Sequence, residues 1–152
     1  YMKAAEEGFV LAQLLLGDRF TDGKGVYQNY KKAAYWYTKA AEQDDVSAQF
    51  KLGIIHEKGS GVLQDYKTAV YWLTKAAKQG HAEAQFVLGF MYLLERGVIR
   101  DDVEAYAWVN VSAAQGFEEA EEGRDLIAKE MTPIQIEKAQ ELSKVYYDKY
   151  VK

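Results

Sequence analysis

Three tryptophans, Trp36, Trp72 and Trp108, stand 36 residues apart, and the residues around them recur in the same register. No insertion breaks this period along the chain. A period in the range of roughly 20–50 residues indicates stacked supersecondary units, because one unit cannot bury its apolar face until a neighbour covers it. We therefore expect a repeat protein whose function lies on an extended surface.

Each repeat has the pattern of a helical hairpin. In the second repeat, Ala48, Leu52 and Ile55 have the spacing of one helical face, a Gly-Ser-Gly turn follows at 59–61, and a second helix follows Asp65. We predict repeats at 9–44, 45–80 and 81–116, preceded by the end of another repeat at 1–8 and followed by a partial repeat and cap at 117–152. The expected fold is an all-α, right-handed solenoid of about eight helices, with the first helices of the hairpins lining one concave face.

Capping residues mark where these helices begin and end. Asn29, Asp65 and Asp101 occupy one register and carry side chains that accept hydrogen bonds at a helix start, and Glu104 is placed to complete a capping box with Asp101. Thr132, Pro133 and Gln135 predict a capped C-terminal helix. The second helices are expected to end in left-handed residues, at the positions Asp44, Gly80 and Gly116.

The composition excludes several classes of partner and site. The net charge of −4 provides no basic excess for a nucleic acid. There is no cysteine, so disulfides and thiolate metal sites are excluded, and no apolar run is long enough to span a bilayer. Because the chain starts on the end of a repeat, we expect sequence upstream, and the compartment stays open between cytoplasm and, with a signal peptide, periplasm or exterior. The oligomeric state stays open as well.

No catalytic constellation is recognisable in the sequence. None of the serines has a lysine three residues on, and the Gly-x-Gly turns lack the rest of a phosphate-binding loop. His56 stands in the register of aromatic residues and His81 at a helix start, and neither has metal-ligand neighbours at helical spacing. We therefore expect no catalytic residue, no metal and no cofactor.

The repeat pattern resembles a known family. The second repeat reads Ala-Gln-Phe-Lys-Leu-Gly at 48–53, Lys-Gly-Ser-Gly-Val at 58–62 and Ala-Val-Tyr-Trp-Leu-Thr-Lys-Ala-Ala at 69–77. This closely resembles the Sel-one-like repeat (SLR) family, which is related to the tetratricopeptide repeat, and the ending of the chain resembles the cap of bacterial members. The resemblance implies a scaffold for protein–protein interaction, in bacterial signalling or envelope processes. It implies no particular ligand, because a fold does not determine function.

A second apolar stripe on the first helices is the candidate binding surface. In the third repeat, Phe86, Phe90 and Leu93 lie about 160–200° away from the core-facing stripe, and the second repeat carries Phe50 and Ile54 in the same register. We predict that these five residues hold a protein or peptide partner. The alternative is that they fill seams between adjacent helices. A second functional class also stays open, a regulatory or enzyme-associated module, related to β-lactams or peptidoglycan, whose catalytic part lies outside this chain.

Overall fold

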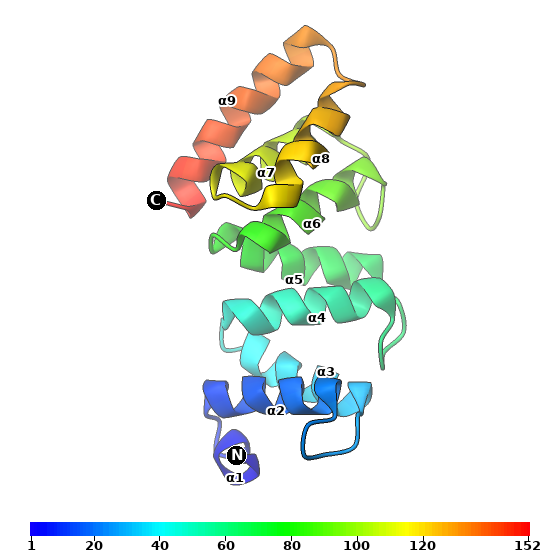
Figure 1. Ribbon diagram of the computed structural model, residues 1–152, viewed down its shortest axis with the longest axis vertical. Helices are drawn as coiled ribbons and strands as arrows, with labels where there is room; N and C mark the ends of the chain where they lie inside the picture. Colours follow the sequence, from blue (N-terminus) through cyan, green and yellow to red (C-terminus); the bar gives the residue numbers. More distant parts are fainter. The chain divides into compact units, whose positions relative to one another are not determined.

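The computed structural model describes residues 1–152 and contains nine helices and no strand (Figure 1). They are α1 (Met2–Glu6), α2 (Val10–Asp22), α3 (Tyr30–Ala41), α4 (Val46–Lys58), α5 (Tyr66–Lys78), α6 (Ala82–Leu93), α7 (Asp102–Ala114), α8 (Glu118–Ala128) and α9 (Pro133–Tyr150). The all-α prediction is confirmed. The structure has one helix more than the expected eight. The chain divides into two compact units, 1–72 and 73–152, which are described separately.

The first unit packs its helices in chain order. Helix α1 lies against α2, α2 against α3, and α3 against α4. Leu16, Trp36 and Leu52 are buried between them, together with alanines that are almost fully inaccessible, such as Ala33 and Ala48. Small residues let two helices approach closely, and the large rings fill the space that remains.

In the second unit α7 is the central helix, since α6, α8 and α9 all pack against it. Trp108 on α7 is 3% exposed. Its ring stacks on Tyr146 of α9, with 4.4 Å between ring centroids, and on Tyr150 at 5.8 Å. Helix α9 thus covers the apolar side of α7, as a terminal cap of a repeat array must.

The predicted N-caps are confirmed, with one correction. The side chains of Asn29, Asp65 and Asp101 each accept a hydrogen bond from the backbone N–H three residues on, at 3.0–3.1 Å. Thr132 and Gln135 form the predicted capping box. The box predicted at Asp101 is wrong. The Glu104 carboxylate instead accepts a hydrogen bond from the Tyr146 hydroxyl, which lies 3.0 Å from both carboxylate oxygens. Burial raises the pKa of Glu104.

The predicted left-handed residues are also confirmed. Gly80 and Gly116 have φ angles of 86° and 87°, and Asp44 has a φ of 63°. Glu95, with a φ of 56°, stands in the register of Gly59, which has a φ of 72°. A residue with a Cβ atom pays a steric cost of roughly 1–2 kcal/mol in this conformation. The backbone is therefore strained at Glu95, after the end of α6, but not at Gly59, the corresponding position of the second repeat.

A buried glutamine joins each hairpin to the preceding helix. Gln13, Gln49 and Gln85 are at most 3% exposed. Each Nε2 donates to the carbonyl oxygen eight residues earlier, in Ala5 (3.1 Å), Ala41 (3.3 Å) and Ala77 (3.0 Å) respectively. These carbonyl groups lie at the ends of helices, and each also accepts a hydrogen bond from the backbone N–H three residues on, so the glutamine provides a second bond to the same oxygen. We refer to these glutamine bonds as the glutamine joints.

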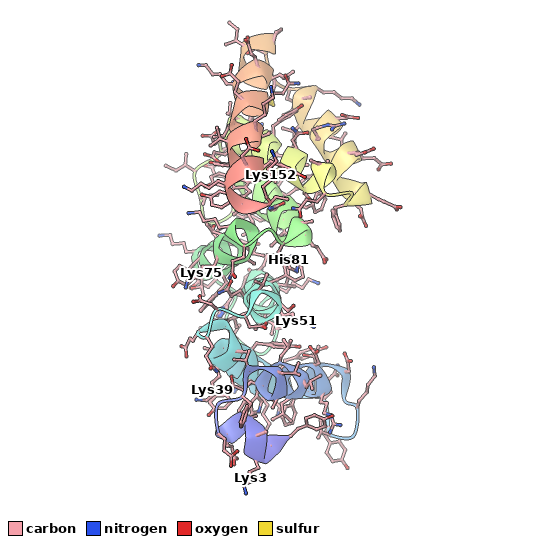
Figure 2. The ribbon with its side chains drawn as sticks, turned by 90° about the vertical axis from the view of Figure 1, so that its left-hand side faces the viewer. Lys3, Lys39, Lys51, Lys75, His81 and Lys152 are labelled. Atoms are coloured by element: carbon pink, nitrogen blue, oxygen red, sulfur yellow. The ribbon has the colours of Figure 1, made fainter.

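Stability should depend on pH through His81, the N-cap of α6 (Figure 2). Its Nδ1 accepts a hydrogen bond from the N–H of Ala84 at 3.1 Å, which requires a neutral ring nitrogen. Burial lowers the pKa of His81, although Glu83 opposes this. The unfolded chain therefore binds more protons, and the free energy of unfolding should fall as pH drops below the ordinary histidine pKa of about 6.5. Urea unfolding of the wild-type chain between about pH 7.5 and 5.5 measures this loss. These two pH values lie about one unit above and below that pKa.

The matched variant is His81→Asn, because asparagine caps a helix without titrating. We expect the variant to lose less stability than the wild type over this range. Burial also lowers the pKa of His56, so a smaller pH dependence should remain in the variant. Equal losses in the two proteins would show that the α6 cap does not titrate.

Candidate functional site

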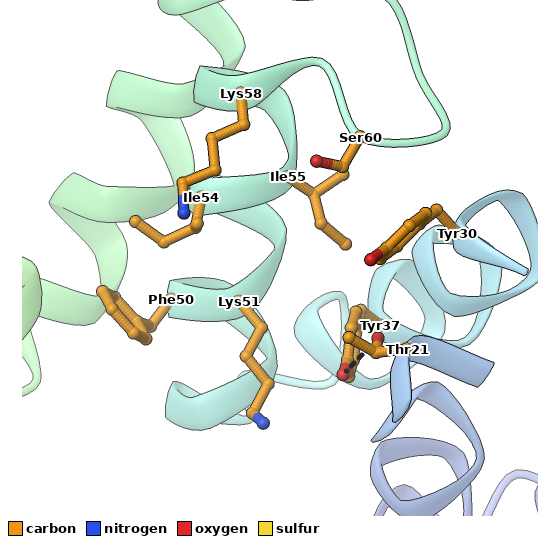
Figure 3. Close-up of a pocket in the computed structure, with 9 residues that line it drawn as sticks. All are labelled: Thr21, Tyr30, Tyr37, Phe50, Lys51, Ile54, Ile55, Lys58 and Ser60. Atoms are coloured by element: carbon orange, nitrogen blue, oxygen red, sulfur yellow. Dashed lines mark hydrogen bonds between the residues drawn. The ribbon is translucent and has the colours of Figure 1, made fainter. Parts of the chain in front are cut away.

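A cavity of about 320 Å³ opens in the first unit, between the C-terminal part of α4 and helices α2 and α3 (Figure 3). Nine residues line it: Thr21, Tyr30, Tyr37, Phe50, Lys51, Ile54, Ile55, Lys58 and Ser60. We call it the α4 cavity. Most of its lining comes from one face of α4, because residues three, four and seven apart on a helix point the same way.

The apolar part of the α4 cavity contains two of the predicted site residues. Phe50 and Ile54 are one helical turn apart, both half-buried, and Figure 3 shows their side chains extending to the same side of α4. Ile55 is buried and points towards α3. An aliphatic and an aromatic side chain that are both half-buried form an apolar surface that a ligand can still contact.

A hydrogen-bonded network closes the wall formed by α2 and α3. The Tyr37 hydroxyl donates to Asp18 at 2.7 Å, and the ammonium of Lys51 pairs with the same oxygen at 2.7 Å. Thr21 Oγ1 lies 3.1 Å from the Tyr37 hydroxyl. Burial raises the pKa of Tyr37, so this phenol stays protonated. The sequence did not predict this network, because Leu73 and Val109 occupy the register of Tyr37 in the other repeats.

Three donors of the cavity lining have no acceptor within the protein. Lys58 Nζ and Ser60 Oγ make no hydrogen bond or ion pair, and the Tyr30 hydroxyl accepts from Gln28 at 3.0 Å, which leaves its own proton without an acceptor in the protein. Figure 3 shows the hydroxyls of Tyr30 and Ser60 directed toward α4, and the Lys58 side chain extending along α4 toward Ile54. The lining contains no carboxylate. It can therefore donate hydrogen bonds to an anionic group.

The other three predicted site residues belong to the second unit. Phe86 and Phe90 contact each other, with ring centroids 4.9 Å apart, and Phe86 also contacts Phe117 at 5.2 Å. Both rings pack against Gly123 of α8, where an added Cβ atom would lie 3.0–3.1 Å from them. This is the packing that the seam alternative predicts, with α8 as the adjacent helix.

Leu93 lies at the edge of that packing. With Phe90 it lines a second cavity, of about 340 Å³, which α8 closes on the other side. The five predicted residues thus form two groups, one in each unit. Phe50 and Ile54 line a cavity with unused hydrogen-bond donors, whereas Phe86 and Phe90 are held mainly by neighbouring rings and by α8.

Comparison with known proteins identifies relatives. A model of the Sel1 repeat matches residues 10–45, 46–81 and 82–117. Among solved structures, a Sel1 repeat protein from Oxalobacter formigenes is 35% identical, with a TM-score of 0.77 over 82% of this chain and 51% of its own. A protective antigen of uropathogenic Escherichia coli strains, which displays an SLR fold, is 32% identical, with a TM-score of 0.68 over 99% of this chain and 40% of its own.

A more distant structure extends the likeness of fold. Cysteine-rich protein B of Helicobacter pylori is 23% identical, with a TM-score of 0.62 over 78% of this chain and 90% of its own. A search of curated proteins finds no significant match. The chain spans about half or less of the length of the two more similar structures. None of its helices combines the length and apolar character needed to cross a membrane.

Proposed function

Because this chain belongs to the Sel1 repeat family, whose members generally act as scaffolds for protein–protein interaction, we propose that it binds a peptide segment of a partner protein. The proposed site is the α4 cavity, on the face that we expect to be the concave one, with Phe50 and Ile54 as the apolar anchors. The proposed setting is a bacterial signalling or envelope process. We assign the chain no reaction of its own, since the family is typically non-catalytic.

The observation that supports this proposal is the combination of an apolar patch and unused donors in one cavity. Binding sites are commonly concave and mostly apolar, with a few polar groups that fix the orientation of the ligand. In the α4 cavity, Phe50 and Ile54 provide the apolar surface, and Lys58 and Ser60 provide the polar groups.

Panning of a phage-displayed library of random 12-residue peptides on the purified chain tests the proposal. We expect enriched peptides to bind the wild type, and Phe50→Ser or Ile54→Ser to weaken binding on the order of tenfold or more, as for anchors of an interface. The melting temperature of these variants should change little, since both side chains line an open cavity. Phe86→Ser and Phe90→Ser should instead lower the melting temperature, by about 2–4 °C per kcal/mol lost.

Tyr27→Ser is the control, because Tyr27 is a fully exposed aromatic residue of the same unit that does not line the cavity. It should leave both binding and stability unchanged. Failure to enrich any peptide above an empty-bait control would refute peptide binding by this chain. If peptides bind but Phe50→Ser and Ile54→Ser have no effect on them, the site is elsewhere.

A further inference from the structure

We propose that the α4 cavity selects peptide segments in which an acidic side chain is close in sequence to an apolar one. This rests on the proposed peptide-binding function and adds the chemistry of the ligand. The acidic side chain would pair with Lys58. The apolar side chain would lie against Phe50 and Ile54.

The charge of the cavity is the first argument. Its lining contains two lysines and no carboxylate, in a chain whose net charge is −4. Lys51 is already paired with Asp18 at 2.7 Å, so its charge is largely compensated within the protein. Lys58 is exposed and has no acidic partner. The uncompensated charge in the cavity is therefore positive and is carried by Lys58.

The hydrogen-bonding groups of the lining are the second argument. Lys58 carries an ammonium with three donors, and Ser60 and Tyr30 each have a hydroxyl proton without an acceptor. A carboxylate has two oxygens with about four lone-pair sites, so it can accept several hydrogen bonds, and it donates none. A neutral amide would satisfy fewer of these donors, and hydrogen bonds to a charged acceptor are roughly twice as strong.

The position of the Lys58 ammonium sets the spacing within the ligand. Lys58 and Ile54 are one helical turn apart on α4, and Figure 3 shows the Lys58 side chain extending back along the helix toward Ile54. Two side chains that are close in the sequence of a peptide can therefore meet the ammonium and the apolar pair together.

The test compares the peptides selected by four forms of the chain. Wild type, Lys58→Glu, Lys58→Gln and Lys3→Glu are panned with the same 12-residue library, whose peptides are fused at their C-termini and so present no terminal carboxylate. Lys3→Glu makes the same change of charge as Lys58→Glu, but on α1, away from α4 (Figure 2). Thermal unfolding of each variant shows whether it is folded.

We expect the peptides selected by wild type and by Lys3→Glu to be enriched in Asp and Glu near an apolar residue. Lys58→Gln should lose this preference, and Lys58→Glu should reverse it towards Lys and Arg. For one selected acidic peptide, Lys58→Glu or replacement of the acid by its amide should each weaken binding on the order of tenfold, as expected for loss of a charge-assisted bond. Binding should also weaken as salt is raised.

Three outcomes would overturn the inference. Selected peptides without an acidic preference would refute it and leave the proposed function standing. The same holds for an acidic preference that persists in a folded Lys58→Glu variant. Failure of the wild type to enrich any peptide would refute the proposed function, and this inference with it. If Lys58→Glu does not fold, the Lys58→Gln variant and the amide peptide decide the matter in the same way.

Discussion

Replacement of Trp108 by alanine should destabilise the second unit by about 3–5 kcal/mol, the usual cost of truncating a large buried aromatic residue. The side chain is 3% exposed and stacks on Tyr146 and Tyr150, so its removal leaves a cavity between α7 and α9. The Tyr146 hydroxyl, which bonds Glu104 at 3.0 Å, would lose the ring that positions it. Urea unfolding followed by circular dichroism measures the loss.

Trp108→Phe is the matched variant, because it keeps a ring against Tyr146 and removes only part of the volume. It should lose clearly less stability than Trp108→Ala. Hydrogen exchange should show the amides of α9 less protected in the alanine variant, since α9 is held to α7 by these rings. A loss below about 1 kcal/mol for Trp108→Ala, a value typical of peripheral sites, would contradict this account of the cap.

Replacement of Gly89 by alanine should also destabilise the second unit, by about 1–3 kcal/mol or more, the usual cost of overpacking. A Cβ atom at this position would lie 2.5 Å from Val109 Cγ2 and 2.8 Å from the carbonyl oxygen of Ala105. The second contact is with backbone, which cannot rotate away, so α6 and α7 would have to separate. This cost outweighs the preference of about 1 kcal/mol for alanine over glycine within a helix. Thermal unfolding measures the net change.

Gly123→Ala is the matched control, because Gly123 is also a buried glycine within a helix. Its nearest neighbours are ring atoms of Phe86 and Phe90, at 3.0–3.2 Å, and rings can shift by a few tenths of an ångström. We expect its stability to stay within about 1 kcal/mol of wild type, since the helix preference of alanine offsets the contact. The double variant Gly89→Ala, Val109→Ala should recover only part of the loss. Full recovery would show that the backbone contact does not matter.

The features that were predicted correctly depend on residues close in sequence. The 36-residue period, the caps at Asn29, Asp65 and Asp101, and the left-handed residue at Asp44 all follow from interactions within a few positions. The prediction failed at Glu104, where the local capping box competes with a hydroxyl that α9 brings from 42 residues away. A local pattern cannot reveal such a competitor.

The candidate site was predictable only in its apolar part. Phe50 and Ile54 could be selected by helical spacing, but the donors around them could not. Tyr30 and Ser60 come from two different hairpins, and only the packing of α3 against α4 brings them to one cavity. Likewise, the surroundings of Phe86 and Phe90 depend on a helix, α8, that follows the last complete repeat.

The glutamine joints make it easier for such a chain to gain repeats by duplication. Both partners of a joint lie within eight residues, as in Gln49 and Ala41, so most duplications of 36 residues copy donor and acceptor together. The duplicated repeat then already contains both groups of the hydrogen bond that joins it to the preceding helix. At the corresponding position after the third repeat the chain has Glu121, an exposed carboxylate that cannot donate to a carbonyl group. The series of glutamine joints ends at α8, and the next helix, α9, is the cap.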